Sequence, residues 1–450
     1  MAHNVTLLCG SRSLPWATLQ STAEAISLQP VILSALDGQR VPSPQGKRID
    51  GYYRTLAIRD LRTSKPWDMA MEHAHQDPTR RFLSESLAML QKFRCSQSTD
   101  PRDSVFSLIG VMPRSFQAII RAPDYSISAR SMYMDIATLL INHHQSFDIL
   151  FSAGMLNQAV VLPSWCPDWS TLPPQTSIGC LMKEGISLQK TQKSTKYGTR
   201  SALIIGKENP GSATRHGFYQ AGGRLNPKVG WGNKGNILIS SGKVMGIISE
   251  IQDGLQPDIT PNMDIGEFQY QKVSTRLFSL RACMTMASTC APYPSGHDHI
   301  SVCGQTLMAG LTRDLKRVPA DEARSAMASC LIVTEVFKDR WLEFNKTKDY
   351  SILKPAASEH EEGSLVFAGQ YEAFTRGRVF FTTTNNYMGL APVGSMPGDA
   401  ICVVQGCSIP LVMRPKGDHW ILIGESYVHG IMDGEAMDMN YIESRNIAIE

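Results

Sequence analysis

Near the C-terminal end of the sequence, four ionisable side chains fall within eleven residues: Glu425, His429, Asp433 and Glu435. Carboxylates and an imidazole that converge on one point can act as general acids and bases or bind a metal ion. Their spacing does not follow a known ligand signature, and the glycines at 430 and 434 are typical of a loop. We therefore expect structural hydrogen bonds or a partner surface here, with an acid–base or metal site as the alternative.

The loop interpretation makes a specific prediction about the two last carboxylates. Asp433 and Glu435 should accept hydrogen bonds from backbone N–H groups and from a nearby cation, for which Arg414 is the best candidate. Such contacts would lower the pKa of both carboxyl groups. On this view, Asp433→Asn destabilises the fold and removes no metal-dependent activity.

Three further groups of residues could carry chemistry. Asp100, Arg102 and Asp103 form either a catalytic pair with an arginine clamp or a helix cap with a salt bridge, and the second is the commoner arrangement. A zinc site is conceivable from Cys283, Cys290, His297, His299 and Cys303, but only the two histidines have ligand spacing, so thiols followed by a polar loop are expected. The glycine-rich residues 206–235 contain no phosphate-binding signature.

The overall composition excludes several classes of protein. The 450 residues are 42% hydrophobic and 19% charged, as in folded globular proteins, and the net charge of +3 gives no reason to expect nucleic acid as a partner. The sequence has no apolar run of membrane-spanning length and no secretory leader. The ten cysteines include no CxxC pair and read as reduced thiols. We expect a cytoplasmic protein without a cofactor.

Short apolar runs separated by turn residues predict strands around the first cluster. They cover residues 379–383, 400–404, 409–413 and 420–423, and the last three should form an antiparallel meander. We expect the final strand to place Tyr427 and His429 in a loop bounded by glycines. Further strands are expected at residues 4–9, 202–205, 237–240 and 243–248.

Helical spacing of apolar residues predicts helices at 14–26, 83–93, 128–142, 268–286 and 320–344. A further helix should start at Pro101, capped by Asp100, and bury Val105, Phe106, Leu108 and Ile109. Trp165 and Trp169 lie in a proline-flanked block that should pack between the helical and β parts. Residues 351–364 are expected to be a polar linker.

Several of these motifs carry a resemblance to a known family. Arg378, Phe380, Phe381 and Thr382, then Tyr387, Gly389, Leu390 and Pro392, and the run Gly424 to Glu435 are similar to the C-terminal part of fungal heterokaryon incompatibility (HET domain) proteins. The blocks around Asp100–Gly110 and Leu162–Ser170 resemble that family too. Cys9, Gly10 and Trp16 match the end of its signature domain, whose opening motifs do not occur, so we expect the chain to start near the end of that domain.

Together these patterns predict an α+β fold: a helical subdomain packed on an antiparallel β-subdomain that a helical insertion interrupts. The expected parts are a signature-domain remnant (1–26), an irregular linker (27–77), the helical subdomain (78–150), the β-subdomain (155–254 plus 377–440) and the helical insertion (262–350). The resemblance implies a non-enzymatic interaction protein of nonself recognition and cell death, with a protein partner and a function that truncation could abolish. The alternative is a hydrolase or nucleotide-acting enzyme with its site near Glu425–Glu435.

Overall fold

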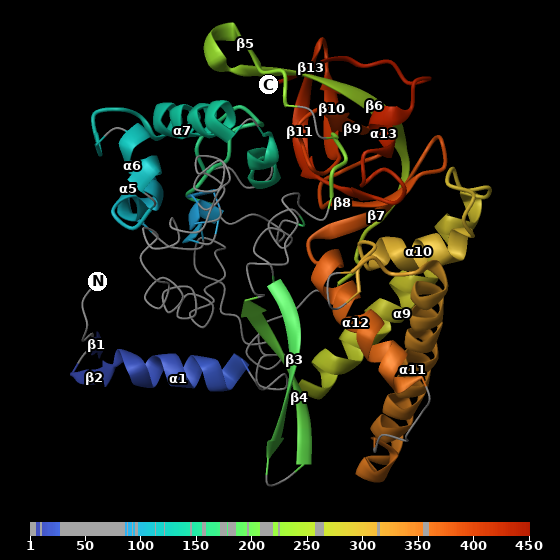
Figure 1. Ribbon diagram of the computed structural model, residues 1–450. Coiled ribbons are helices and arrows are strands. Elements are labelled where there is room, and N and C mark those ends of the chain that lie inside the picture. Colours follow the sequence, from blue (N-terminus) through green and yellow to red (C-terminus); the bar gives the residue numbers. More distant parts are fainter. Residues whose placement is uncertain are drawn as a thin grey trace.

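The computed structural model describes residues 6–9, 11–27, 86–87, 89–91, 93–94, 98–112, 114–120, 122–144, 146–154, 159–171, 178, 186–195, 198–207, 219–223, 226–256, 265–312, 316–353 and 360–450. A largely antiparallel sheet is joined to helices from two parts of the chain (Figure 1), so the expected α+β class is confirmed. Most of the expected linker, residues 28–77, lies outside the described residues. The other segment boundaries stay predictions.

The centre of the sheet is a closed barrel. β6 (Ile237–Gln252) pairs with β13 (Arg445–Ile449), which runs parallel to β11 (His419–Glu425). β10 (Leu411–Lys416) and β9 (Ala400–Val404) follow in antiparallel order, and β9 pairs back onto β6. The pairings therefore close a ring, in which β11 and β13 meet at Trp420 and Ile449, and the predicted meander of three successive strands is confirmed.

The second half of β6 leaves the barrel and continues the sheet. There it pairs with β7 (Arg378–Thr383), which is followed by β8 (Met388–Pro392) and β12 (Tyr427–Val428). The two strands expected at 237–240 and 243–248 are thus one long strand, whose register shifts after Val244 and after Ile248. Such bulges increase the local twist and let one strand serve both halves of the sheet.

β8 was not predicted, and its composition explains why. Gly389 and Pro392 both lower strand propensity. A Cβ atom at Gly389 would lie 2.3 Å from the carbonyl oxygen of Tyr427 and 2.4 Å from the ring of Phe381, so only glycine fits between these strands. All residues of β7, β8 and β9 are buried, which matches their continuous apolar runs.

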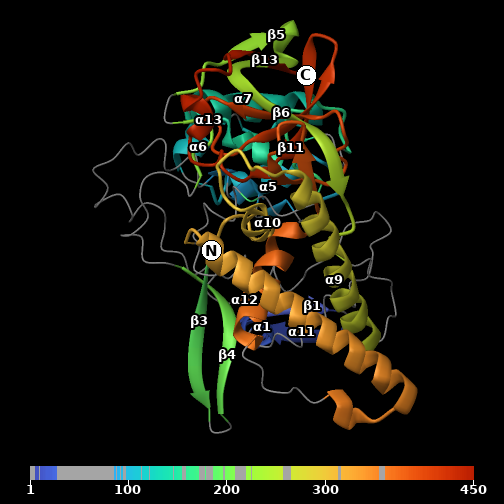
Figure 2. The same cartoon turned by 90° about the vertical axis from the view of Figure 1, so that its right-hand side faces the viewer.

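Four helices lie below the barrel (Figures 1 and 2). α9 (Ile265–Thr289) and α11 (Ala320–Thr347) occupy the positions predicted for long helices. α10 (His299–Leu307) corrects the sequence interpretation, which gave a polar loop there, and α12 (Glu361–Thr375) begins inside the linker expected at 351–364. The carboxylate of Asp298 accepts a hydrogen bond from the backbone N–H of Ser301 and thereby caps α10, a signal that the sequence contains.

A separate helical group lies beside the barrel and contains α5 (Asp103–Ile109), α6 (Arg114–Ile119) and α7 (Ala129–His144). Val105 is fully buried and Leu108 nearly so, as expected. Phe106 and Ile109 are less completely buried than these two, and the ring of Tyr125 covers Phe106 edge-on, at 5.2 Å between centroids. All four residues are thus mostly buried, as predicted.

The short 3-10 helix η2 (Asp148–Ser152) connects this helical group to the barrel. Phe147 donates its backbone N–H to the carbonyl oxygen of Gly406, and the Asp148 carboxylate accepts hydrogen bonds from the backbone N–H and hydroxyl of Ser408. These contacts fix the helical group to the β9–β10 turn.

The tryptophan block reinforces the same junction. Trp165 and Trp169 are both buried. The indole N–H of Trp165 donates to the carbonyl oxygen of Asn236 beside β6, and its ring lies 5.1 Å from that of Trp231 in β5 (Gly230–Gly232). Trp169 lies instead under the guanidinium of Arg94, 5.6 Å from its ring centroid. The two rings therefore contact opposite sides of the junction, as predicted.

The remaining described elements are β1 (Thr6–Cys9), β2 (Arg12–Pro15), α1 (Trp16–Ser27) and the two-stranded ribbon of β3 (Ile186–Thr195) and β4 (Gly198–Lys207). They agree with the strand predicted at 4–9, the helix at 14–26 and the strand at 202–205. In the part of the chain that the structure describes, no helix has the length and apolar character needed to cross a membrane.

Candidate functional site

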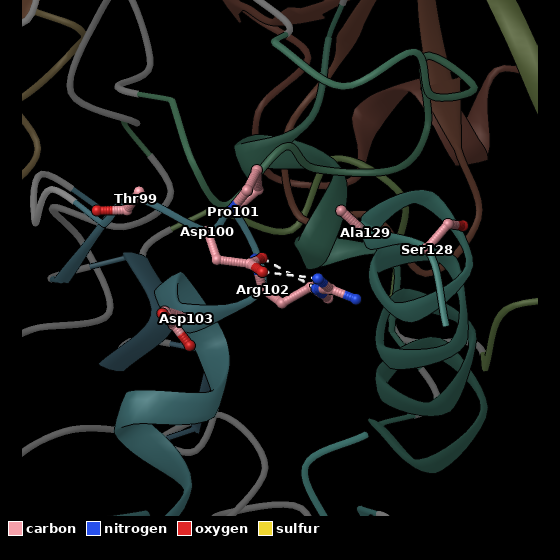
Figure 3. A pocket seen from close by; sticks show the side chains of 7 residues that line it. All are labelled: Thr99, Asp100, Pro101, Arg102, Asp103, Ser128 and Ala129. Carbon is pink, nitrogen blue, oxygen red and sulfur yellow. Dashed lines mark hydrogen bonds and ion pairs between the residues drawn. The ribbon is translucent and has the colours of Figure 1, made fainter. Parts of the chain in front are cut away.

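The first candidate site is a cavity of about 460 Å³ between the start of α5 and the start of α7. Figure 3 shows its lining residues: Thr99, Asp100, Pro101, Arg102, Asp103, Ser128 and Ala129. The guanidinium of Arg102 points at the carboxylate of Asp100 and donates two hydrogen bonds to it, at 2.9 and 2.6 Å. This is the paired geometry in which arginine binds carboxylates most strongly.

The remaining contacts of this group are also internal. The other terminal nitrogen of Arg102 donates to the carbonyl oxygens of Tyr125, at 2.5 Å, and Ile127, at 2.7 Å. The hydroxyl of Tyr125 donates to the carboxylate of Asp103 at 2.6 Å. Hydrogen bonds from Arg102 lower the pKa of Asp100, which is the opposite of what a general acid near neutral pH requires. The arrangement ties α5 to the segment before α7 and supports the structural alternative.

Asp100 does not cap α5 in the way that the sequence indicated. The helix begins at Asp103, and the residue before it, Arg102, provides no side-chain cap. Asp100 instead accepts a hydrogen bond from the backbone N–H of Arg102, two residues along the chain. The motif thus builds a turn that precedes the helix.

The second candidate is the 424–435 segment, whose four ionisable residues do not converge. The Glu425 carboxylate is completely buried and pairs with the equally buried guanidinium of Arg378, at 2.8 Å, while also accepting the backbone N–H of Ile178. Both partners come from the sheet, because Arg378 opens β7 and Glu425 ends β11. Glu425 therefore cross-links the interior and is closed off from any substrate.

His429 lies in a cluster of aromatic rings. Its Nδ1 atom is 3.3 Å from the hydroxyl of Tyr427, and its backbone carbonyl accepts a hydrogen bond from the hydroxyl of Tyr293 at 2.8 Å. The rings of Tyr293 and His297 lie 5.8 and 6.0 Å from the imidazole. Burial lowers the pKa of His429 to about 4, with smaller contributions from His297 and Arg317, so this imidazole is neutral at pH 7.

Asp433 is bound by Arg317, which corrects the expected role of Arg414. Arg317 pairs with the Asp433 carboxylate and lies over the ring of Tyr219, 4.6 Å from its centroid. Arg414 instead binds Asp399 across a turn, with two contacts of 2.8 and 2.9 Å. The expected lowering of the carboxylate pKa was also wrong for Asp433: although its side chain is about half exposed, partial desolvation outweighs the attraction of Arg317 and raises the pKa.

The C-terminal end of the segment is held by a buried lysine of β6. Glu435 accepts the backbone N–H of Asp433 and begins the short helix α13 (Glu435–Asp438). The Lys243 ammonium then donates to the carbonyl oxygens of Ala436, Met437 and Met439, at 2.9 to 3.1 Å. Lys243 thus provides a donor for three carbonyl groups at the end of this helix.

Lys243→Met should lower the free energy of unfolding by about 3 kcal/mol, because it removes three hydrogen bonds of a buried ammonium, and of the three carbonyl groups that of Met439 still accepts the backbone N–H of Ile442. Urea denaturation would measure the loss, and amide exchange should become faster around residues 436–439. Lys416→Met is the control: its ammonium is exposed and contacts only Glu450 among the described residues, so we expect less than about 1 kcal/mol. Equal effects of the two substitutions would contradict the anchoring role.

The zinc candidates are distributed over different environments. Cys283, Cys290 and Cys303 are buried, and burial raises the pKa of their thiols. His297 faces His429, whereas His299 lies beside Asp298 at the start of α10. Over the ranges that the structure describes, no group of three histidine, cysteine or carboxylate side chains has the arrangement of a metal site.

Sequence reasoning missed the partners that surround the 424–435 segment. Tyr219 lies before β6, Tyr293 and Arg317 lie between β6 and β7, and none of them carries a local pattern. Gly310, whose Cβ atom would lie 2.5 Å from the Tyr427 hydroxyl, could have been noticed only with the structure in hand. Long-range contacts of this kind leave no trace in the spacing of residues.

Comparison with known proteins finds a similarity over the C-terminal part of the chain. Residues 336–445 match the family model of the Het-6 beta-barrel domain. Heterokaryon incompatibility protein 6, OR allele, of Neurospora crassa is 30% identical over 155 residues, which cover 31% of this chain and 22% of that protein. No solved structure gives a significant match. The resemblance noticed in the sequence motifs is thereby confirmed.

Proposed function

Because this chain is related to the heterokaryon incompatibility proteins of fungi through its barrel domain, we propose that it is a non-enzymatic interaction protein of nonself recognition. It acts in the cytoplasm through a protein partner, and engagement of that partner leads to cell death. The relative's name supports only heterokaryon incompatibility, and the match spans 22% of that relative's length.

One observation supports the non-enzymatic role above the others: the ionisable residues of the motifs serve as cross-links. Arg102 binds Asp100, Arg378 binds Glu425, and Arg317 binds Asp433, each joining the motif to a neighbouring segment or fixing its turn. A catalytic site needs such groups to face a reacting atom with a suitable pKa. The competing interpretation is a hydrolase or nucleotide-acting enzyme near Glu425–Glu435. Among the described residues, no such arrangement of ionisable groups supports it.

A forced heterokaryon tests the proposal. One fungal strain would express the full chain and the second would lack it, and growth rate and uptake of a vital dye would be measured after fusion. We expect slower growth and more dead cells than in a heterokaryon that carries the empty vector. Normal growth with the folded chain present at a confirmed level would overturn the proposal.

Two conservative substitutions separate the two kinds of function. Asp433→Asn and Glu435→Gln remove the charges that a catalytic site would need, and both residues lie at the surface end of the segment. An interaction protein that still folds should keep its effect on the heterokaryon. Loss of the effect with an unchanged thermal unfolding curve would favour the enzyme.

A further inference from the structure

The two longest helices carry a group of large apolar side chains that remain open to water. Phe278 of α9 is 70% exposed, and Ile332, Val336 and Leu342 of α11 are 42%, 45% and 41% exposed. α11 lies at the outer edge of the molecule in Figure 1 and crosses its front in Figure 2. Apolar side chains that gather on an outer surface typically mark an interaction site.

Contacts between α9 and α11 show how the two helices are arranged. Arg281 forms an ion pair with Glu335, and Tyr270 stacks on Trp341 at 5.9 Å between ring centroids. The earlier residue of α9 thus contacts the later residue of α11, so the helices lie side by side and run in opposite directions. Both side chains of the ion pair are about half exposed, so the pair marks the outer side of the two helices.

The exposed apolar residues lie on the side that this ion pair marks. Phe278 is three residues from Arg281, and Ile332 is three residues from Glu335. Leu342 follows Glu335 by seven residues, which is two helical turns. Residues at these spacings share one face of a helix. The four apolar side chains therefore contribute to one outer face, formed by α9 and α11 together.

We propose that this outer face of α9 and α11 docks against the same face of a second copy of the chain. The two α11 helices pack antiparallel about a two-fold axis, so every contact occurs twice. The inference concerns self-association and holds independently of the proposed function.

The charges along α11 are self-complementary in this arrangement. The first turn of the helix carries Asp321 and Glu322, whereas its last turn carries Lys346 and its C-cap residue is Lys348. All four side chains are exposed. Antiparallel packing places each acidic first turn beside the basic last turn of the other copy, whereas parallel packing would bring like charges together. Such complementarity selects the antiparallel arrangement.

The apolar residues lie close to the point where the axis would pass. α11 spans Ala320–Thr347, so its midpoint falls between Val333 and Thr334. Ile332 and Val336 lie on either side of that midpoint, and antiparallel packing brings Ile332 of one copy next to Val336 of the other. Two helices of this length form a face about 40 Å long and about 20 Å wide, or about 800 Å², which is what one partner contributes to a standard interface.

Sedimentation equilibrium of the full chain tests the dimer. We expect twice the mass of the single chain at micromolar concentrations, with dissociation to the single chain on dilution. A chain that stays monomeric up to about 100 μM, where even a weak interface would be occupied, would overturn the proposal and leave the face to a different protein.

Substitutions of exposed residues make the assignment specific. Ile332→Glu should raise the dissociation constant at least about 100-fold, because it places a charge in the contact close to the axis in both copies. Phe278→Ser removes the most exposed ring of the face and should also weaken the dimer. The matched control is Val161→Glu, which changes a side chain that is 84% exposed beside Arg130 of α7 and should leave the dimer intact. A dimer that persists in both variants of the face would contradict the proposal.

A charge exchange tests the antiparallel arrangement of the two copies. Glu322→Lys should weaken the dimer about 5-fold, because it places a lysine beside Lys346 at both ends of the contact. Lys346→Glu should have a similar effect. The two substitutions in one chain should restore the original dissociation constant, because each new charge again lies beside its opposite. Losses that add up in the double variant would contradict this pairing.

Discussion

Glu425→Gln should lower the free energy of unfolding by about 3–5 kcal/mol, although it changes only one charged group for an amide of the same shape. The reason is that Arg378 and Glu425 are both completely excluded from water. Removing one partner of a buried pair leaves the other charge uncompensated in a poorly polarisable interior. Urea denaturation followed by tryptophan fluorescence would measure the loss, since Trp420 lies on the same strand as Glu425.

A matched exposed pair provides the control. Arg281 and Glu335 join α9 to α11 and both side chains are about half exposed, so Glu335→Gln should cost less than about 1 kcal/mol. Replacing both buried partners, as in Arg378→Met with Glu425→Leu, should be milder than breaking the pair, because no charge is then left alone. A small effect of Glu425→Gln, equal to that of Glu335→Gln, would show that water reaches the pair.

The parts of the fold that could be predicted from sequence are those with a local pattern. β9, β10 and β11 follow one another with turn residues between them, and α9 and α11 have long apolar stripes. α12 was missed because its short apolar face follows directly on a polar stretch. β8 was missed because glycine and proline occupy positions where strand formers are expected.

The candidate sites were harder to predict, because their partners are distant in the sequence. Arg414 was assigned to Asp433 from their nearness along the chain, yet the turn before β9 presents Asp399 to it. Arg317, the true partner, lies 116 residues before Asp433. The local motif Asp100–Asp103 was predicted to be structural, and its contacts agree, because they are formed within a short stretch.

Barrel closure depends on two strands that lie outside the family match, apart from the first residue of β13. Residues 336–445 match the Het-6 beta-barrel domain, whereas β6 ends at Gln252 and β13 starts at Arg445. β13 lies between β6 and β11, and no other described strand joins those two across this gap. We therefore expect residues 237–252 and 445–450 to be as necessary for a stable barrel as the matched residues.

Deletion of residues 445–450 should abolish cooperative unfolding of the barrel. It removes the backbone pairing of β13 on both sides and the two fully buried side chains Ile447 and Ile449. Truncation of either isoleucine to alanine typically lowers the free energy of unfolding by about 2–5 kcal/mol. The deletion should therefore remove most of the roughly 5–15 kcal/mol that typically stabilises a domain. The deletion also releases Ser164, whose backbone N–H binds the carbonyl oxygen of Glu450.

Point substitutions in the same strand test this interpretation without removing the strand. Ile447→Ala should cost about 2–5 kcal/mol, whereas Asn446→Ala, at an exposed neighbouring position, should stay within about 0.5 kcal/mol. Calorimetry of the full chain and of each variant would compare them, since loss of β13 leaves β6 and β11 with unpaired edges that cannot be satisfied elsewhere in the ring. If the deleted chain melted like the intact one, the pairing of β6 with β9 would have to hold the barrel by itself, and closure through β13 would add nothing to its stability.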